Sequence, residues 1–221
     1  MAIVTDNERS VSGLGTTGVI IPAFDVAATA DLIFVGVMGI GVSVATSTVV
    51  RNVTENFSED WDIVYHPAGI EPHSSGHHIL KADFAAGSFT IVVTCAGSLD
   101  TLAAYARSFI GVNQAVPAGA PVTGTGAASV SATVTADTAL GEVILDTLAA
   151  GGSTSCAVDA NQTSLFEQDN IDAVGSHGVS TQAGVDGGVM SWTIESGNWA
   201  LGAISFKPAV SSRKWFFGRV S

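Results

Sequence analysis

The chain has 221 residues, of which 47% are hydrophobic and 13% charged, so it holds enough apolar material for one large domain with a core. Twenty acidic and eight basic residues give a formal net charge of −12, which argues against nucleic acid and anionic lipid as partners. The first residues lack a basic segment followed by an apolar run, so we expect no secretory signal and synthesis in a cytoplasm.

Short segments of alternating polar and apolar residues, bounded by Gly, Pro, Ser or Asp, recur along the whole chain. This spacing predicts an all-β fold, an antiparallel β-sandwich of roughly ten to twelve strands. We assign residues 1–16 to an N-terminal arm, residues 17–209 to the sandwich and residues 210–221 to a C-terminal tail. No internal repeat is visible, and the Gly-rich stretch 117–129 does not divide the chain.

The longest apolar segment, residues 32–50, contains nineteen uncharged residues, about the length of a membrane-spanning helix. Its three glycines, its Ser and Thr residues and its many β-branched residues favour a strand instead, so we expect no membrane partner. Residues 99–111 fit either a helical face or a strand face. The strands expected on both sides favour a strand there as well.

The acidic segment 52–62 carries Glu55, Glu59, Asp60 and Asp62. Carboxylates on a turn could bind calcium together with backbone carbonyls. The segment lacks the residue order of a dedicated calcium loop, so we favour a solvated charge run.

Three histidines within six positions, His73, His77 and His78, raise the question of a metal site. On a strand, His77 and His78 point to opposite faces, whereas a zinc pair on one strand needs i and i+2 spacing. His78 shares a face with Leu80, so we expect a half-buried, hydrogen-bonded ring. His73 and His77 are expected to face solvent, and we predict no metal and no cofactor.

The remaining chemically active residue types also have simple interpretations. Cys95 and Cys156 are expected to be buried thiols rather than a disulfide. Trp61, Trp192 and Trp199 fit strand positions typical of a core better than a platform for sugar rings. No Gly-x-Ser-x-Gly elbow is present, so we predict no catalytic residue and no enzyme.

Five segments resemble, in chain order, the jelly-roll-like β-sandwich domains of tailed-phage virion proteins and of some bacterial surface proteins: "LIFVGVMG", "AAGSFTIVVTCAG", "ARSFIGVNQAVP", "GEVILDTLAAGG" and "GVMSWTIESGNWALGAISFKPA". The hallmarks of those domains look like Gly111–Gln114 and Trp199–Pro208 here. The resemblance implies a non-enzymatic structural protein of the virion, a capsid decoration or cement protein on the capsid exterior. The alternative is a tail-fibre or head-fibre adhesin that binds host carbohydrate.

The same resemblance implies two kinds of partner. One is the major capsid protein or another virion protein, which a decoration protein must bind. The other is a further copy of the chain, in a homotrimer, because capsid surfaces offer three-fold sites.

The last segment combines cations and large aromatic rings on an otherwise acidic protein, namely Arg213, Lys214, Trp215, Phe216, Phe217 and Arg219. Left in water, these rings would form an exposed apolar patch. The segment either folds back on its own domain or docks on a partner or a neighbouring copy. Aromatic and Arg side chains dominate interface energies, so we favour docking and predict that these residues bind a partner.

Overall fold

The computed structural model describes residues 2–51, 55–65, 69–185 and 187–210. Within these ranges the chain forms twelve strands and one short 3-10 helix, which confirms the predicted all-β, antiparallel fold. Residues 32–50 and 99–110 both lie in strands, as expected. No helix in the described part of the chain is long and apolar enough to cross a membrane.

The first sheet has the order β1-β6-β3-β5-β4, with β2 paired to the early part of β6. Its strands are β1 (Val4–Leu14), β2 (Gly18–Val26), β3 (Leu32–Arg51), β4 (Ser58–Val64), β5 (Glu71–Leu80) and β6 (Gly87–Ile110). The 3-10 helix η1 (Lys81–Asp83) lies between β5 and β6, so the strand begun at Glu71 stops before Lys81. Most of the predicted arm is therefore a strand of this sheet, because β1 pairs with β6 along its length.

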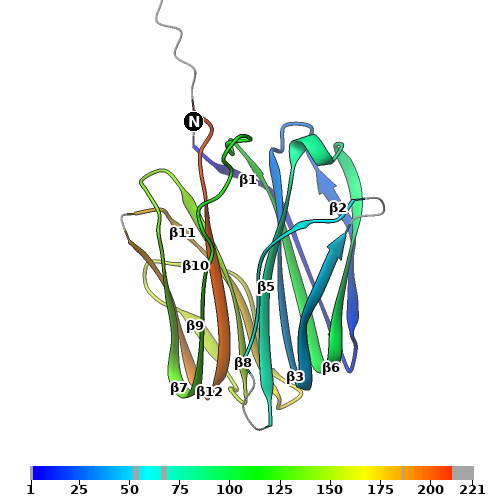
Figure 1. The fold of residues 1–221 in the computed structure, drawn as a ribbon, viewed down its shortest axis with the longest axis vertical. Helices are drawn as coiled ribbons and strands as arrows, with labels where there is room; N and C mark the ends of the chain where they lie inside the picture. The colour runs from blue at the N-terminus through cyan, green and yellow to red at the C-terminus, as the bar shows by residue number, and fades with distance from the viewer. Residues whose placement is uncertain (1, 52–54, 66–68, 186, 211–221) are drawn as a thin grey trace, which may run out of the picture.

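The second sheet has the order β10-β11-β8-β12-β7, with β9 paired to the early part of β12. Its strands are β7 (Val122–Ala136), β8 (Val143–Gly151), β9 (Cys156–Val158), β10 (Thr163–Ile171), β11 (Gly175–Ala183) and β12 (Gly188–Phe206). The two sheets lie side by side in Figure 1, one from each half of the chain.

The two sheets repeat one topology. The first sheet contains the run β6-β3-β5-β4, and the second contains the matching run β12-β8-β11-β10. On the other side of this run, β7 pairs with β12 in the second sheet, and β1 and β2 together pair with β6 in the first. Leu32 pairs with Phe109 in the first sheet as Val143 pairs with Phe206 in the second. In this register "AAYARSF" (103–109) and "ALGAISF" (200–206) share two alanines, the serine and the phenylalanine. The chain is a structural duplication, which the sequence analysis missed.

Equivalent residues meet where the two sheets face each other. The rings of Phe109 and Phe206 lie with their centroids 6.2 Å apart. A Cβ added to Gly36 would collide with the methyl group of Thr147, its equivalent in the second sheet. A residue that meets its own equivalent lies near a two-fold axis, so the halves pack as a dimer of like units would.

Strand β3 is buried on both faces, which explains its nearly continuous apolar sequence. Phe34 and Met38 point to the second sheet, where they join apolar residues of β8 and β12. Ile33 and Val35 point the other way, into a second cluster completed by β2 and the early part of β6. The first sheet therefore bends over itself and covers its own outer face, and the second sheet does the same around Trp192 and Trp199.

Trp61 of β4 joins the two sheets. A Cβ on Gly76 of β5 or on Gly202 of β12 would overlap the indole ring, so both positions need glycine. The indole Nε1 donates a hydrogen bond to Ser74 Oγ at 3.1 Å. Trp61, Trp192 and Trp199 are all buried, which confirms their predicted place in the core.

Candidate functional site

The predicted partner-binding residues lie outside the described residues. Arg213, Lys214, Trp215, Phe216, Phe217 and Arg219 all follow Val210, the last described residue. The residues just before them, Pro208 and Ala209, are held in the fold and are called the root of the tail below. The Ala209 amide donates a hydrogen bond to the Gly111 carbonyl at 2.7 Å, and Pro208 forms a β-bridge with Val112. This root lies at the same end of the molecule as the N-terminus (Figure 1).

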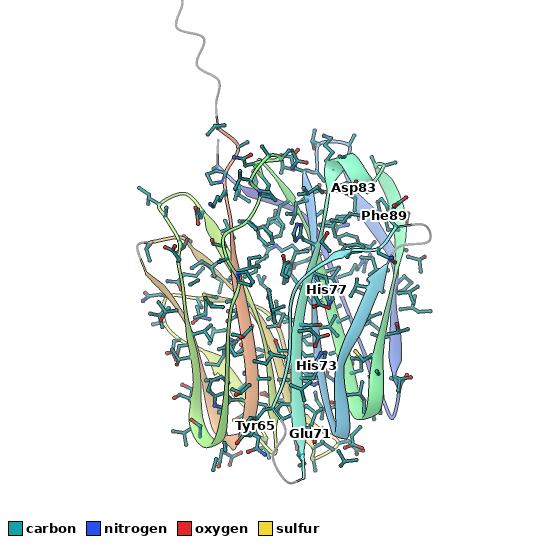
Figure 2. The ribbon with its side chains drawn as sticks, viewed as in Figure 1. Tyr65, Glu71, His73, His77, Asp83 and Phe89 are labelled. Carbon is teal, nitrogen blue, oxygen red and sulfur yellow. The ribbon has the colours of Figure 1, made fainter. Side chains whose placement is uncertain are left out.

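The three histidines lie on β5, and two of them were predicted wrongly. His73 and His77 are buried, at 0% and 1% exposure, instead of facing solvent; Figure 2 shows them along the same strand. They point toward the cluster that the bent part of the first sheet covers, a layer that strand periodicity does not reveal. His78 is half-buried and its Nδ1 lies 2.8 Å from Asp60 Oδ1, as expected of a hydrogen-bonded ring.

The acidic segment is also less solvated than predicted. Asp60 and Asp62 are on β4, and their side chains are 6% and 5% exposed. Asp62 Oδ1 lies 2.7 Å from His73 Nε2, so each of these carboxylates pairs with a histidine of the neighbouring strand. Burial raises the pKa of Asp60, against the hydrogen bond to His78 that lowers it.

The imidazoles of His77 and His177 are held neutral. Burial lowers the pKa of His77 to about 4 and that of His177 to about 3, because the charged form loses its hydration in the interior. His77 Nε2 lies 3.0 Å from Ser75 Oγ, and His177 Nε2 lies 3.2 Å from Thr101 Oγ1. Among the described residues, no group of three His, Cys, Asp or Glu side chains could hold a metal ion.

Chelation is therefore expected to leave stability unchanged. Asp60 and Asp62 of β4 are each paired with a histidine of β5, so the fold needs no metal to neutralise these two carboxylates. Thermal melting with and without a strong chelator measures this. A melting temperature lowered by many degrees on chelation would show that these residues hold a structural ion.

The two thiols are in separate places. Cys95 is buried in the cluster covered by β2, and Cys156 is buried in the corresponding cluster of the second sheet. Burial raises the pKa of the Cys156 thiol, with nearby carboxylates adding to the effect. This thiol therefore stays protonated and unreactive, as expected of a cysteine that serves packing.

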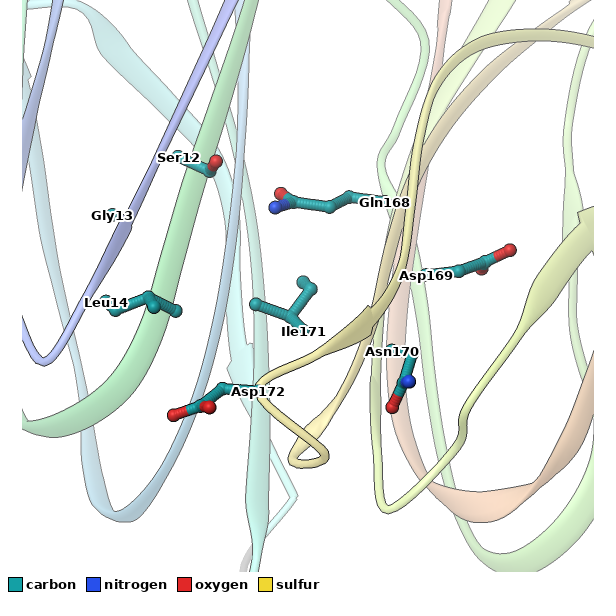
Figure 3. A pocket seen from close by; sticks show the side chains of 8 residues that line it. All are labelled: Ser12, Gly13, Leu14, Gln168, Asp169, Asn170, Ile171 and Asp172. Atoms are coloured by element: carbon teal, nitrogen blue, oxygen red, sulfur yellow. The ribbon is translucent and has the colours of Figure 1, made fainter.

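Two of the solvent-accessible hollows lie along one seam between the sheets, where the edge strands β1 and β10 lie. The first hollow has a volume of about 440 Å³ and is lined by Ser12, Gly13, Leu14, Gln168, Asp169, Asn170, Ile171 and Asp172. Figure 3 shows Leu14 and Ile171 facing each other across it. We call it the seam pocket. A smaller hollow of about 270 Å³, lined by Glu8, Arg9, Ser10, Tyr105 and Leu165, involves the same two strands.

The seam pocket combines apolar and acidic groups. Leu14 is 60% exposed, Ile171 is buried and Asp172 is exposed beside them. The carboxylate of Asp169 points away from the pocket and accepts a hydrogen bond from the Cys156 amide at 2.9 Å. Gln168 Oε1 is buried without a hydrogen-bond donor within the described part of the chain. The pocket therefore offers an apolar wall and negative charge, with an unpartnered acceptor buried behind them, which suits a cationic ligand with an apolar body.

Comparison with known proteins assigns no family. No protein-family model matches the sequence, and no curated protein matches it significantly. The class that the fold itself defines is a duplicated, antiparallel all-β protein with two bent sheets packed face to face.

Proposed function

We propose that this chain is a non-enzymatic structural protein of a tailed-phage virion, a decoration or cement protein on the capsid exterior. The virion role follows from the sequence resemblance, and the observation that supports its non-enzymatic part is where the reactive residue types lie. His73, His77, His177 and Asp146 are fully or almost fully buried, and their hydrogen bonds are made within the core. Side chains committed in this way stabilise a fold and do not reach a substrate.

The adhesin alternative has less support. A carbohydrate platform needs exposed aromatic rings, and the strongly exposed large apolar residues of the described chain are all aliphatic. The seam pocket is lined by acidic, amide and aliphatic groups. Three further aromatic residues belong to the tail, where three cations accompany them as at a protein interface.

Imaging of virions that carry a tagged copy of the protein tests the proposal. Label spread over the head surface in a repeating pattern is the expected result. Label confined to fibres, together with binding of the purified protein to host glycans, would favour the adhesin. Absence of the label from purified virions would overturn the proposal.

A further inference from the structure

We propose that the C-terminal tail of one copy docks in the seam pocket of a second copy. The tail is residues 211–221, and the pocket lies between β1 and β10 at the end of the sandwich away from the tail's root. This inference rests on the proposed function only in taking the tail as the segment that binds a partner. It names that partner as another copy of this chain.

The chemistry of the pocket complements the tail. Leu14 and Ile171 present an apolar wall on which an indole or phenyl ring can pack. The exposed carboxylate of Asp172 lies beside this wall, while the tail carries Arg213, Lys214 and Arg219. Opposite charges around an apolar contact set the register and orientation of the bound segment.

Gln168 supplies a second, independent indication. Its Oε1 is buried and accepts no hydrogen bond within the described residues, although a buried acceptor without a donor is costly. The side chain lies over the space between the two edge strands (Figure 3). The tail is rich in donors that fit this acceptor, from the guanidinium groups, the ammonium group and the indole N–H.

The reach of the chain favours a neighbour's tail over a copy's own. The root lies beside the first residue of β1, since Val4 pairs with Ile110 and the Ala209 amide bonds to Gly111. Leu14 lies at the other end of this eleven-residue strand, roughly 33 Å away at about 3.3 Å per residue. Trp215 follows Val210 by five residues, which span at most about 18 Å when fully extended. The Cα of Phe217 reaches only about 25 Å even when the tail is fully extended, so a neighbour's tail, which need not be stretched, fits the pocket better than the copy's own.

Such a contact joins two different surfaces of the same chain. Head-to-tail contacts of this kind close into rings when the rotation between copies allows it, and extend into filaments otherwise. A ring of three copies is the closed form that agrees with the expected homotrimer. Each ring would present several weak capsid-binding surfaces at once, which strengthens attachment through effective concentration.

Charge reversal at the pocket tests the docking in the full chain. Leu14→Lys places a cation beside those of the tail and removes part of the apolar wall, and the exposure of Leu14 makes misfolding an improbable result. Ile20→Lys is the matched control, because Ile20 is 53% exposed on β2, outside the seam. Sedimentation velocity should show an oligomer for the unchanged protein and the control. Leu14→Lys should weaken self-association by about tenfold or more.

Cross-linking identifies which surfaces meet. One chain carries Leu14→Cys and the other Phe216→Cys, and the two are mixed under mild oxidation. A disulfide-linked pair should form much faster than with Ile20→Cys in place of Leu14→Cys. An unchanged protein that sediments as a monomer, an oligomer unaffected by Leu14→Lys, or equal cross-linking with both partners would each overturn the inference.

The outcomes separate this inference from the proposed function. A protein that decorates heads but is a monomer in solution would refute the tail-to-pocket contact alone. A tail-dependent oligomer that is absent from virions would refute the virion role alone.

Discussion

Deletion of residues 211–221 is expected to abolish both self-association and attachment to capsids while leaving the β-sandwich intact. The described core closes without this segment, since each sheet covers its own outer face and the inner faces cover each other. The deletion removes three aromatic rings, whose burial in an interface contributes roughly 2 kcal/mol each. A loss of that size lowers the affinity of the contact by several orders of magnitude.

Two measurements on the truncated chain check this result. The far-UV circular dichroism spectrum should be unchanged, and the melting temperature should match that of the full chain at a concentration where both are monomers. Co-sedimentation with heads should be lost. A substitution of Val130, which is 65% exposed on β7, by Lys serves as the control that alters another exposed apolar surface. A truncated protein that melts early and aggregates, yet still attaches, would show that the tail covers its own domain.

The fold was predictable because it depends on local pattern. β3 has the β-branched and small residues that are typical of a strand. Residues 99–111 fitted both a helix and a strand, and residues 99–110 lie in strand β6. Period-2 alternation reports which residues share a face of a strand, and it placed the three tryptophans in the core. The predicted strand number also agrees with the described structure.

The burial of His73 and His77 could not be predicted in the same way. Alternation shows that these residues point away from His78, but it does not show whether a further layer covers that face. The covering layer is the bent part of the first sheet, which depends on irregular pairing between β3 and β6 near Gly41 and Val44. The available signal was the carboxylates Asp60 and Asp62 on the preceding strand, at positions that could pair with histidines.

The duplication was missed because only spaced residues are shared. Ala103, Ala106, Ser108 and Phe109 recur as Ala200, Ala203, Ser205 and Phe206, while the residues between them differ. Tyr105 is replaced by Gly202 because the two halves fill their common interface asymmetrically, with Trp61 occupying the space above the glycine. The seam pocket was also missed, since it is formed by two edge strands far apart in sequence.

Substitution of Asp146 by Ala is expected to lower the free energy of unfolding by about 3–5 kcal/mol. Asp146 is fully buried on β8, and its Oδ1 accepts hydrogen bonds from the amide and the hydroxyl of Ser180, each at 2.8 Å. Its Oδ2 accepts from Trp192 Nε1 at 2.8 Å and from Gln162 Nε2 at 3.4 Å. Alanine leaves the Ser180 amide and the indole N–H buried without acceptors. Chemical denaturation measures the loss, and unchanged stability would contradict this account.

The same carboxylate should also make stability depend on pH. Burial raises the pKa of Asp146 to about 6, although the hydrogen bonds from Ser180 and Trp192 oppose the shift. An unfolded Asp has a pKa of about 3.9, so between these values the folded protein binds a proton that the unfolded chain releases. The contribution of Asp146 to the free energy of unfolding is therefore greatest at acidic pH and falls by about 3 kcal/mol as the pH rises through 6.

Asp146→Asn keeps the shape of the side chain and cannot titrate, so the difference between its pH profile and that of the unchanged protein isolates this contribution. Parallel profiles between pH 4 and 7 would show that Asp146 stays ionised throughout, held by its four hydrogen-bond donors.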